Sequence, residues 1–307
     1  MVAPEAHPVT SPESARPSGA RRIWKWVGVL AVVGAIALCL TLICNNYALR
    51  PASRQAMQAR SDAALEKAIA WIAEHPTTYR TNPTIMYFVT QIEALTNDPR
   101  LLPVIEEYRR RIIPPRSPVE AVWGRVFDSQ APVPRVTSAE MRFLGLDTRW
   151  NLYGIAPDRV ELTPEERAGL YTPDGNHWGT RQHQMLSLTF YRNFNGSTPE
   201  LDRLISHLAE GVATDAFFDF RVSDNYIQRT TYVLAAGQPQ LIRARWVERI
   251  LDYQNPDGSW NYCWYGWCRG VLEFGFKYNP GHPTVQAAWA LAMLKYRYPQ
   301  WYTEHYQ

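Results

Sequence analysis

Three polar residues with the chemistry of proton transfer stand at the predicted starts of apolar helices. His183 and His282 each precede an apolar run, and Asp224 precedes a third. Histidine exchanges a proton near neutral pH, and the amino end of a helix offers open backbone amides that polarise or hold a ligand. We predict His183, His282 and Asp224 as catalytic residues that exchange protons with a substrate. The structural alternative is that each caps its own helix or packs in the core.

A short turn motif occurs before two of these helices. Pro173-Asp174-Gly175 and Pro256-Asp257-Gly258 are each followed within three residues by a tryptophan, Trp178 in one case and Trp260 in the other. Proline presets φ, aspartate bonds local amides and glycine takes a positive φ, so both segments are predicted to form tight turns. The repeated unit is therefore a turn, a tryptophan anchor, a histidine and an apolar helix.

The helix starts are expected to meet at one place. Asn82 stands before Pro83-Thr84 as His282 stands before Pro283-Thr284, which adds a fourth start to the set. If the helices are arranged in a ring, all four starts face one mouth of it. The residues that we predict to bind an acidic or phosphate-bearing ligand at this mouth, or to anchor it, are His177, Arg181, Arg229, Trp178 and Trp260.

Cys263 and Cys268 lie close together in an aromatic loop, and His282 follows soon after. A local disulfide is expected if the loop lies in an oxidising compartment. A zinc site with both thiolates and His282 is the second interpretation, for which the sequence offers no identifiable fourth ligand. Two free thiols are the third. We predict the disulfide, and no metal or cofactor.

One segment near the amino terminus is predicted to cross a membrane. The run from Trp26 to Cys44 carries no charge and is long enough to span a hydrocarbon core of about 30 Å. We predict a transmembrane helix over 23–45 and a disordered cytoplasmic tail over 1–22, which is rich in proline, serine and alanine. A cleaved signal peptide is the alternative, but the run exceeds the usual apolar region and no small-x-small cleavage site follows it.

Charges on either side of this run predict its orientation. The flanking basic residues are Arg16, Arg21, Arg22 and Lys25 before it, and Arg50, Arg54 and Arg60 after it. The excess before the run favours a cytoplasmic amino terminus, which places the main domain outside the cytoplasm, for example in a periplasm. That compartment is also the one in which a disulfide persists.

After a linker over 46–60, the rest of the chain, 61–307, reads as one helical domain. Apolar residues recur at helical spacing. The predicted helices cover 65–72, 85–95, 101–113, 138–146, 164–170, 183–193, 200–213, 225–236, 240–254 and 283–297. Amphipathic helices alternate with helices that are apolar almost all round, which indicates two layers. The proline-rich segment 114–180 is irregular and either completes the domain or covers it as a lid.

The stretch from Arg245 to Trp260 resembles the QW repeat of the terpenoid cyclase and prenyltransferase superfamily, in which an outer helix ends in Gln and a turn ends in Gly-x-Trp. Gln254, Gly258 and Trp260 match this pattern, and the segment after His282 resembles the inner helix that follows it. The resemblance, mainly over 240–297, implies an all-α fold, an α/α toroid with fewer hairpins than a full ring. Such toroids act on isoprenoids or polysaccharides or bind protein partners. The Asp-x-Asp-Asp acid of the cyclases is absent from the sequence.

Composition narrows the function classes. A formal charge of +3 gives no basis for nucleic-acid binding, whereas 12 Trp and 17 Tyr indicate an aromatic core or cavity. We predict a membrane-anchored, extracytoplasmic toroid whose aromatic cavity binds a small molecule, a polymer or a protein partner. The alternative is an enzyme that acts on a polyisoprenoid or a polysaccharide by His/Asp acid–base chemistry. An enzyme requires converging polar groups that water can reach, whereas a binding module requires a filled centre and an exposed apolar patch.

Overall fold

The computed structural model describes residues 18–48, 52–174, 179–261, 263–267, 272–276 and 280–306. Side chains are described from Ile23 onward within these ranges, except in the two short strands. The chain divides into two units, Met1–Ile43 and Cys44–Gln307. We call them the anchor unit and the helical unit, and describe each by itself.

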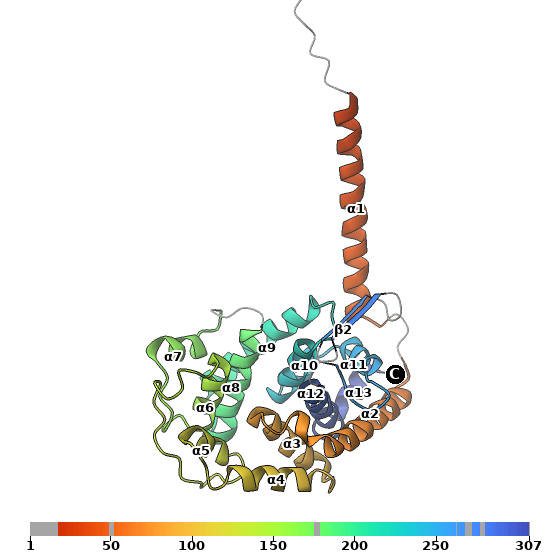
Figure 1. The fold of residues 1–307 in the computed structure, drawn as a ribbon. Coiled ribbons are helices and arrows are strands. Elements are labelled where there is room, and N and C mark those ends of the chain that lie inside the picture. Colours follow the sequence, from red (N-terminus) through yellow and green to blue (C-terminus); the bar gives the residue numbers. More distant parts are fainter. Residues whose placement is uncertain are drawn as a thin grey trace, which may run out of the picture. The chain divides into compact units, whose positions relative to one another are not determined.

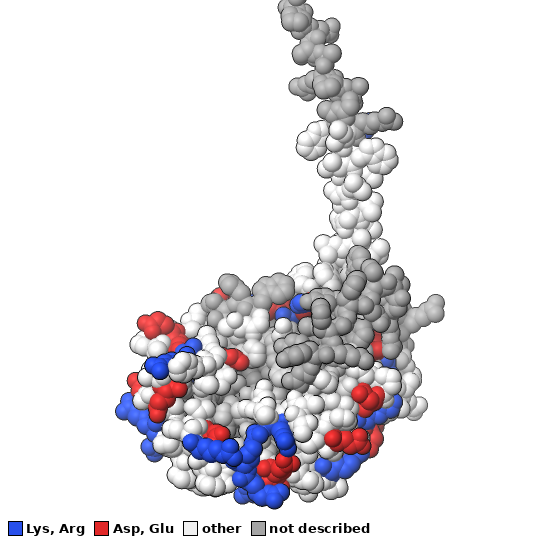
Figure 2. Space-filling view, viewed as in Figure 1, with Lys and Arg blue, Asp and Glu red and all other residues white. Residues whose placement is uncertain are grey.

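The anchor unit contains most of helix α1 (Ser18–Asn46). Its stretch Ile23–Asn46 is long and apolar enough to cross a membrane, which fits a single-pass membrane protein. Large apolar side chains along it are exposed, and Figure 2 shows most of this stretch as a white column; Lys25, near its start, is its one charged residue. The helix begins at Ser18, earlier than the predicted residue 23. The rest of the predicted tail lies outside the described residues.

The helical unit confirms the all-α prediction, apart from one β-hairpin (Figure 1). Its helices are α2 (Arg54–Glu74), α3 (Pro83–Thr96), α4 (Leu102–Ile112), α5 (Pro118–Gly124), α6 (Leu146–Ile155), α7 (Pro164–Tyr171), α8 (Thr180–Asn195), α9 (Pro199–Phe217), α10 (Asp224–Ala235), α11 (Ala244–Asp252), α12 (Gly281–Ala292) and α13 (Gln300–His305). Short helical turns cover Pro76–Thr78, Pro239–Leu241 and Met293–Arg297. Strands β1 (Cys263–Trp267) and β2 (Leu272–Phe276) pair antiparallel.

Local sequence explains where many of these helices begin. The side chains of six residues accept a hydrogen bond from a backbone N–H in the first turn: Ser53, Asn82, Ser117, Thr163, Thr198 and Ser223. Each bond satisfies one of the amide groups that a helix leaves open at its start. Proline stands in the first turn of α3, α4, α5, α7 and α9, where its missing N–H is not needed.

Aromatic side chains fill the contacts between α3, α8, α10 and α12. Phe88 of α3 stacks on Trp289 of α12 with ring centroids 4.6 Å apart, and lies 5.7 Å from Tyr232 of α10. Tyr87 of α3 meets Phe190 of α8 edge-on at 4.8 Å. All five rings are buried, and burying each contributes about 2 kcal/mol or more. The aromatic residues of these four helices therefore form a packed core, where the sequence predicted a cavity.

The segment after α11 forms the tight turn that its sequence predicts. Gln254 donates from Nε2 to the carbonyl oxygens of Ala64 in α2 and of Gly258, at 2.8 and 3.0 Å. Gly258 takes a φ of +94°, and the indole N–H of Trp260 donates to the Ile250 carbonyl at 2.7 Å. The turn therefore joins α11 to α2 through a partly buried hydrogen bond from Gln254.

Two boundary predictions are wrong for physical reasons. The predicted linker to residue 60 ends earlier, because Ser53 caps α2 and Met57 is already buried. The predicted helix over 138–146 is a series of turns, and α6 begins at its end, after Gly145. Phe143 is 84% exposed, so this segment has no continuous apolar face to bury. The β-hairpin and α13 have no counterpart in the prediction.

The irregular segment 114–180 contributes to the core. Helix α6 packs against α8 and buries Trp150 and Leu152. The Trp150 indole N–H donates to the carbonyl of Glu166 in α7 at 2.9 Å, which ties α6 to α7. This part of the segment therefore belongs to the packed helical unit.

Candidate functional site

The first turns of α10 and α12 bring a carboxylate and an imidazole together. The two helices pack side by side (Figure 1), and Asp224 Oδ1 lies 2.5 Å from His282 Nδ1. The side chains are 8% and 22% exposed. A buried carboxylate requires a hydrogen-bond donor, and the Nδ1–H of the imidazole provides one. With its proton held on Nδ1, the neutral ring carries its lone pair on Nε2, which is the form that accepts a proton from a substrate.

The structure does not use these residues as helix caps. Ser223 caps α10, which leaves the Asp224 carboxylate to His282. Among the described residues no side chain caps α12, and His183 lies inside α8 rather than before its first residue, Thr180. Asn82, by contrast, caps α3 with its side chain, so its role is structural. Three of the four predicted helix starts therefore remain candidates for chemistry.

The charges of Asp224 and His282 act on the imidazole of His183. Burial lowers the pKa of His183 below its ordinary value of 6.5; the charges of Asp147 and Asp224 oppose this effect and that of His282 adds to it. Its ring meets the ring of Tyr232 edge-on at 6.0 Å. His183 is therefore uncharged at neutral pH. The structure thus brings together the three residues that the sequence singled out for catalysis.

Four amide side chains lie beside this group, and we call them the amide layer: Gln182, Gln228 and Gln286, which are buried, and Asn225, which is exposed. Gln182 Nε2 donates to Asn225 Oδ1 at 3.1 Å and also to Gln228 Oε1. Gln286 Nε2 lies 3.3 Å from both ring nitrogens of His282. The amide layer therefore links α8, α10 and α12 at the level of the candidate site.

Two acceptors in the amide layer lack a donor. Gln182 Oε1 and Gln286 Oε1 are buried and receive no hydrogen bond within the part of the chain that the structure describes. Leaving such an atom unpaired costs about 1–3 kcal/mol, so it calls for an explanation. Nearby, burial raises the pKa of Tyr232 well above its ordinary value, so its hydroxyl keeps its proton.

Sequence reasoning missed the amide layer and Asp147. The signal for the first was weak: Gln286 is a polar position in a largely apolar helix, but α8 carries many other polar residues beside Gln182. Asp147 lies in the first turn of α6, and its charge acts on His183. It was missed because the preceding segment was assigned to a helix that the structure lacks.

The five predicted ligand-binding residues lie in different environments. Arg229 is buried and pairs with Asp219 at 2.5 Å, and Trp260 is buried in the turn after α11. Both already have a partner within the protein, Asp219 for Arg229 and the Ile250 carbonyl for the Trp260 indole, so their placement does not support ligand binding. Arg181 lies 3.6 Å from Asp215. The remaining two, His177 and Trp178, lie outside the described residues.

The cysteine prediction is tested only in part. Cys263 begins β1, whereas Cys268 lies outside the described residues, so the bridge between them stays a prediction. Within the described ranges, no cluster of three or more His, Cys, Asp or Glu side chains is arranged to hold a metal ion.

Comparisons of the chain with family models, curated proteins and solved structures found no match.

Proposed function

We propose that the helical unit is an enzyme domain, tethered to a membrane by α1, in which Asp224 and His282 carry out acid–base catalysis. The observation that supports this most directly is the buried Asp224 carboxylate 2.5 Å from Nδ1 of a partly exposed histidine. A carboxylate that serves only stability is more simply paired with an arginine, as Asp219 is with Arg229. An imidazole that a carboxylate orients is suited to taking and returning a proton.

The proposed proton-transfer steps follow from the positions of His282, Asp224 and His183. His282 accepts a proton from a ligand hydroxyl or from a water molecule, and Asp224 stabilises the imidazolium that forms. His183 stays uncharged because burial lowers its pKa. It therefore bonds to the ligand without repelling the charge on His282. General acid–base catalysis of this kind contributes about 10²–10⁴-fold to a rate.

The amide layer favours one class of ligand over the other. The two unpaired acceptors, Gln182 Oε1 and Gln286 Oε1, call for hydroxyl or N–H donors. A saccharide supplies many such donors, whereas an isoprenoid chain supplies none. We therefore propose a polysaccharide or oligosaccharide as the substrate and keep the polyisoprenoid as the alternative.

An α/α toroid remains our proposal for the arrangement of the helices. It assigns α3, α8, α10 and α12 to an inner layer and α2, α9 and α11 to an outer one. The contacts of Gln254, Gly258 and Trp260 support it, because they give the QW-like segment a defined role in joining α11 to α2. The packed aromatic core then leaves the ends of the inner helices as the place for a ligand.

The compartment also remains a proposal. The basic residues before the apolar run support a cytoplasmic amino terminus and an extracytoplasmic, for example periplasmic, helical unit. A bridge between Cys263 and Cys268 would agree with that compartment. Protease accessibility in sealed cells, with thiol titration before and after reduction, tests both proposals.

A non-catalytic binding module is the second candidate function. The filled aromatic core formed by α3, α8, α10 and α12 favours it, because a module that holds a partner protein needs no internal cavity. It differs from the first candidate in one respect: binding without turnover.

The test uses the full-length chain in detergent with a panel of neutral and acidic oligosaccharides, and a polyprenyl phosphate as the alternative substrate. Mass spectrometry detects products. We expect turnover of a saccharide, and a loss of about 10²–10⁴-fold in Asp224→Asn and His282→Gln with helicity and melting temperature retained. Binding that both variants retain, without turnover in the wild type, would favour the second candidate.

The chain offers a matched control for these variants. His207 and Asp174 form a second histidine–carboxylate pair at 2.9 Å, but this pair lies on the surface. His207→Gln and Asp174→Asn repeat the same chemical changes away from the candidate site. They should retain full turnover, and equal losses in both pairs would contradict a specific role for Asp224 and His282.

A further inference from the structure

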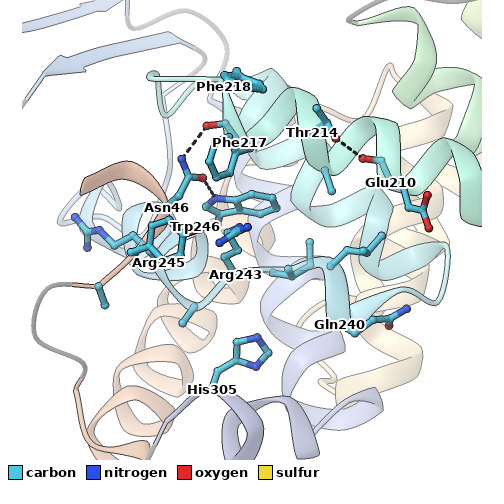
Figure 3. A pocket seen from close by; sticks show the side chains of 16 residues that line it. Asn46, Glu210, Thr214, Phe217, Phe218, Gln240, Arg243, Arg245, Trp246 and His305 are labelled. Atoms are coloured by element: carbon cyan, nitrogen blue, oxygen red, sulfur yellow. Dashed lines mark hydrogen bonds between the residues drawn. The ribbon is translucent and has the colours of Figure 1, made fainter. Parts of the chain in front are cut away.

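A cavity of about 850 Å³ lies in the helical unit beside the residues that follow the apolar run. Figure 3 shows its lining side chains, which come from the carboxyl end of α9, the start of α11 and the segment Asn46–Ala48. Its size is typical of ligand sites in proteins. It lies apart from Asp224 and His282, neither of which lines it.

Asn46 fixes the chain at this cavity. It is buried, its Nδ2 donates to the Phe217 carbonyl at 2.8 Å, and its Oδ1 accepts from the indole N–H of Trp246 at 2.6 Å. Both bonds are drawn in Figure 3. The residues that leave the apolar run are therefore held in place as part of the cavity wall.

Arg243 provides a positive charge in the cavity. Its guanidinium lies over the rings of Tyr47 and Phe217, 4.8 and 5.1 Å from their centroids, and points into the labelled group in Figure 3. Within the described ranges, no ion pair joins Arg243 to a carboxylate. Arg245 differs, because it pairs with Glu248 and Asp252 and points away from this group.

The other groups in the cavity are mixed. Glu210 is an exposed carboxylate among the lining residues and opposes an anionic ligand there. His305 stacks on Trp301, and its Nδ1 lies 2.9 Å from the Trp301 carbonyl oxygen. The rim carries two aromatic side chains, Tyr47 and Phe218, each 50% exposed. Exposed aromatic residues of this kind are typical of the interface between a membrane and water.

Chain connectivity places the lining segment near a membrane surface. From Trp26 to Asn46, α1 rises about 30 Å, the thickness of a hydrocarbon core. Exposed Trp24 and Trp26 mark one end of this span, and Tyr47 marks the other. Because Asn46–Ala48 line the cavity and directly follow the apolar run in the chain, part of the cavity wall is connected to the end of the candidate span.

We propose that this cavity binds the phosphate-bearing headgroup of an anionic lipid from the membrane that α1 enters. Arg243 pairs with the phosphate, since a guanidinium matches phosphate oxygens with two parallel hydrogen bonds. Tyr47 and Phe218 contact the glycerol and the first carbons of the acyl chains. This proposal rests on α1 entering a membrane and does not depend on the chemistry of Asp224 and His282.

The test measures lipid retention by the full-length chain. The protein is placed in nanodiscs of phosphatidylcholine with a minor share of phosphatidylglycerol, extracted with mild detergent, and weighed by native mass spectrometry. We expect the wild type to retain phosphatidylglycerol in preference to phosphatidylcholine. Arg243→Gln should lower that retention about five- to tenfold, since one arginine near a membrane contributes about 1 kcal/mol.

Three further arms keep the proposal falsifiable. Arg110→Gln removes the same charge from α4, where the arginine is exposed, and should retain lipid as the wild type does. Thr214→Trp fills the cavity without altering Arg243 and should also abolish retention, which covers the case in which Arg243→Gln misfolds. Inorganic phosphate in solution should compete weakly. Equal retention of both lipids, unchanged retention in Thr214→Trp, or full displacement by inorganic phosphate would overturn the proposal.

Discussion

Asp224 and His282 lie 58 positions apart in the sequence, yet their side chains meet at 2.5 Å at the starts of two neighbouring helices. Ser223 caps α10 and so leaves the carboxylate available. The packing of α10 against α12 then places the imidazole beside it. One local feature, the Ser223 cap, and one long-range contact, α10 on α12, therefore build the candidate acid–base pair.

The state of the His282 ring is the first prediction. With Asp224 accepting its proton, Nδ1 should keep that proton, and Nε2 should be the nitrogen that takes up and releases one. Nitrogen NMR of the full-length chain with labelled histidine should show this form and a slowly exchanging Nδ1 proton. Asp224→Asn should lose the slow exchange. The exposed His207–Asp174 pair is the internal reference, because its proton is open to water. A His282 ring protonated on Nε2 alone would contradict the geometry.

The second prediction concerns how low pH destabilises the folded protein through His183. Burial lowers the pKa of His183 below 6.5, so the unfolded chain binds the proton more readily than the folded one. The stability that neutral His183 contributes is fully present above pH 6.5. It is lost as the pH falls from 6.5 toward the pKa of His183 in the folded protein, with a slope of at most about 1.4 kcal/mol per pH unit. Urea unfolding across this range should show a smaller acid loss for His183→Gln than for the wild type.

A control separates this effect from general acid sensitivity. His207→Gln also removes a histidine, but one whose ring is exposed and lies outside the buried group. It should keep the acid loss of the wild type. If His183→Gln and His207→Gln behave alike, the neutral state of His183 is not the cause.

Local sequence was sufficient to predict much of the fold. Apolar spacing alone placed α9 and α10 within a few residues of their observed bounds. Where local signals conflicted with burial, prediction failed. The segment before Gly145 has helical spacing but leaves Phe143 exposed, and it forms turns.

The candidate site was predictable in its members but not in its contacts. His183, Asp224 and His282 stood out because each begins or enters an apolar helix. Their partners depend on which helices pack together, which one sequence does not specify. Arg229 shows the converse error, because an arginine in an apolar helix suggested ligand binding, whereas Asp219 ten residues earlier pairs with it.

The third prediction tests that buried ion pair. Asp219 bonds to Arg229 at 2.5 Å and to Arg221 at 3.0 Å. Burial alone would raise the pKa of Asp219, but the two arginines lower it by more, so the pKa lies below its ordinary value. Asp219→Asn leaves the Arg229 charge buried without its counter-ion, which should cost about 3–5 kcal/mol of unfolding free energy. Asp158→Asn breaks an exposed pair with Arg125 and should cost at most about 1 kcal/mol. Equal losses of unfolding free energy in the two variants would show that burial does not make the Asp219–Arg229 pair more costly to break.

The fourth prediction concerns the turn after α11. Gly258 has a φ of +94°, and a Cβ added there would lie 2.4 Å from the Lys67 carbonyl oxygen in α2. Gly196 has a similar φ of +93°, but no atom lies within 4 Å of its added Cβ. Gly196→Ala therefore introduces backbone strain alone, about 1–2 kcal/mol. Gly258→Ala adds a clash of the new Cβ with the Lys67 carbonyl oxygen and should cost about 3 kcal/mol or more.

The difference between these two variants isolates the close approach of the turn to α2. Both replace a glycine with a φ near +93° by alanine and so introduce backbone strain, but only Gly258→Ala adds the clash with Lys67. Thermal unfolding of the full-length chain should rank Gly258→Ala well below Gly196→Ala. In addition, Gln254→Ala should fall between wild type and Gly258→Ala, because it removes the bonds to the Ala64 and Gly258 carbonyl oxygens but introduces no clash. Equal melting temperatures for the two glycine variants would mean that the turn does not pack on α2 as described.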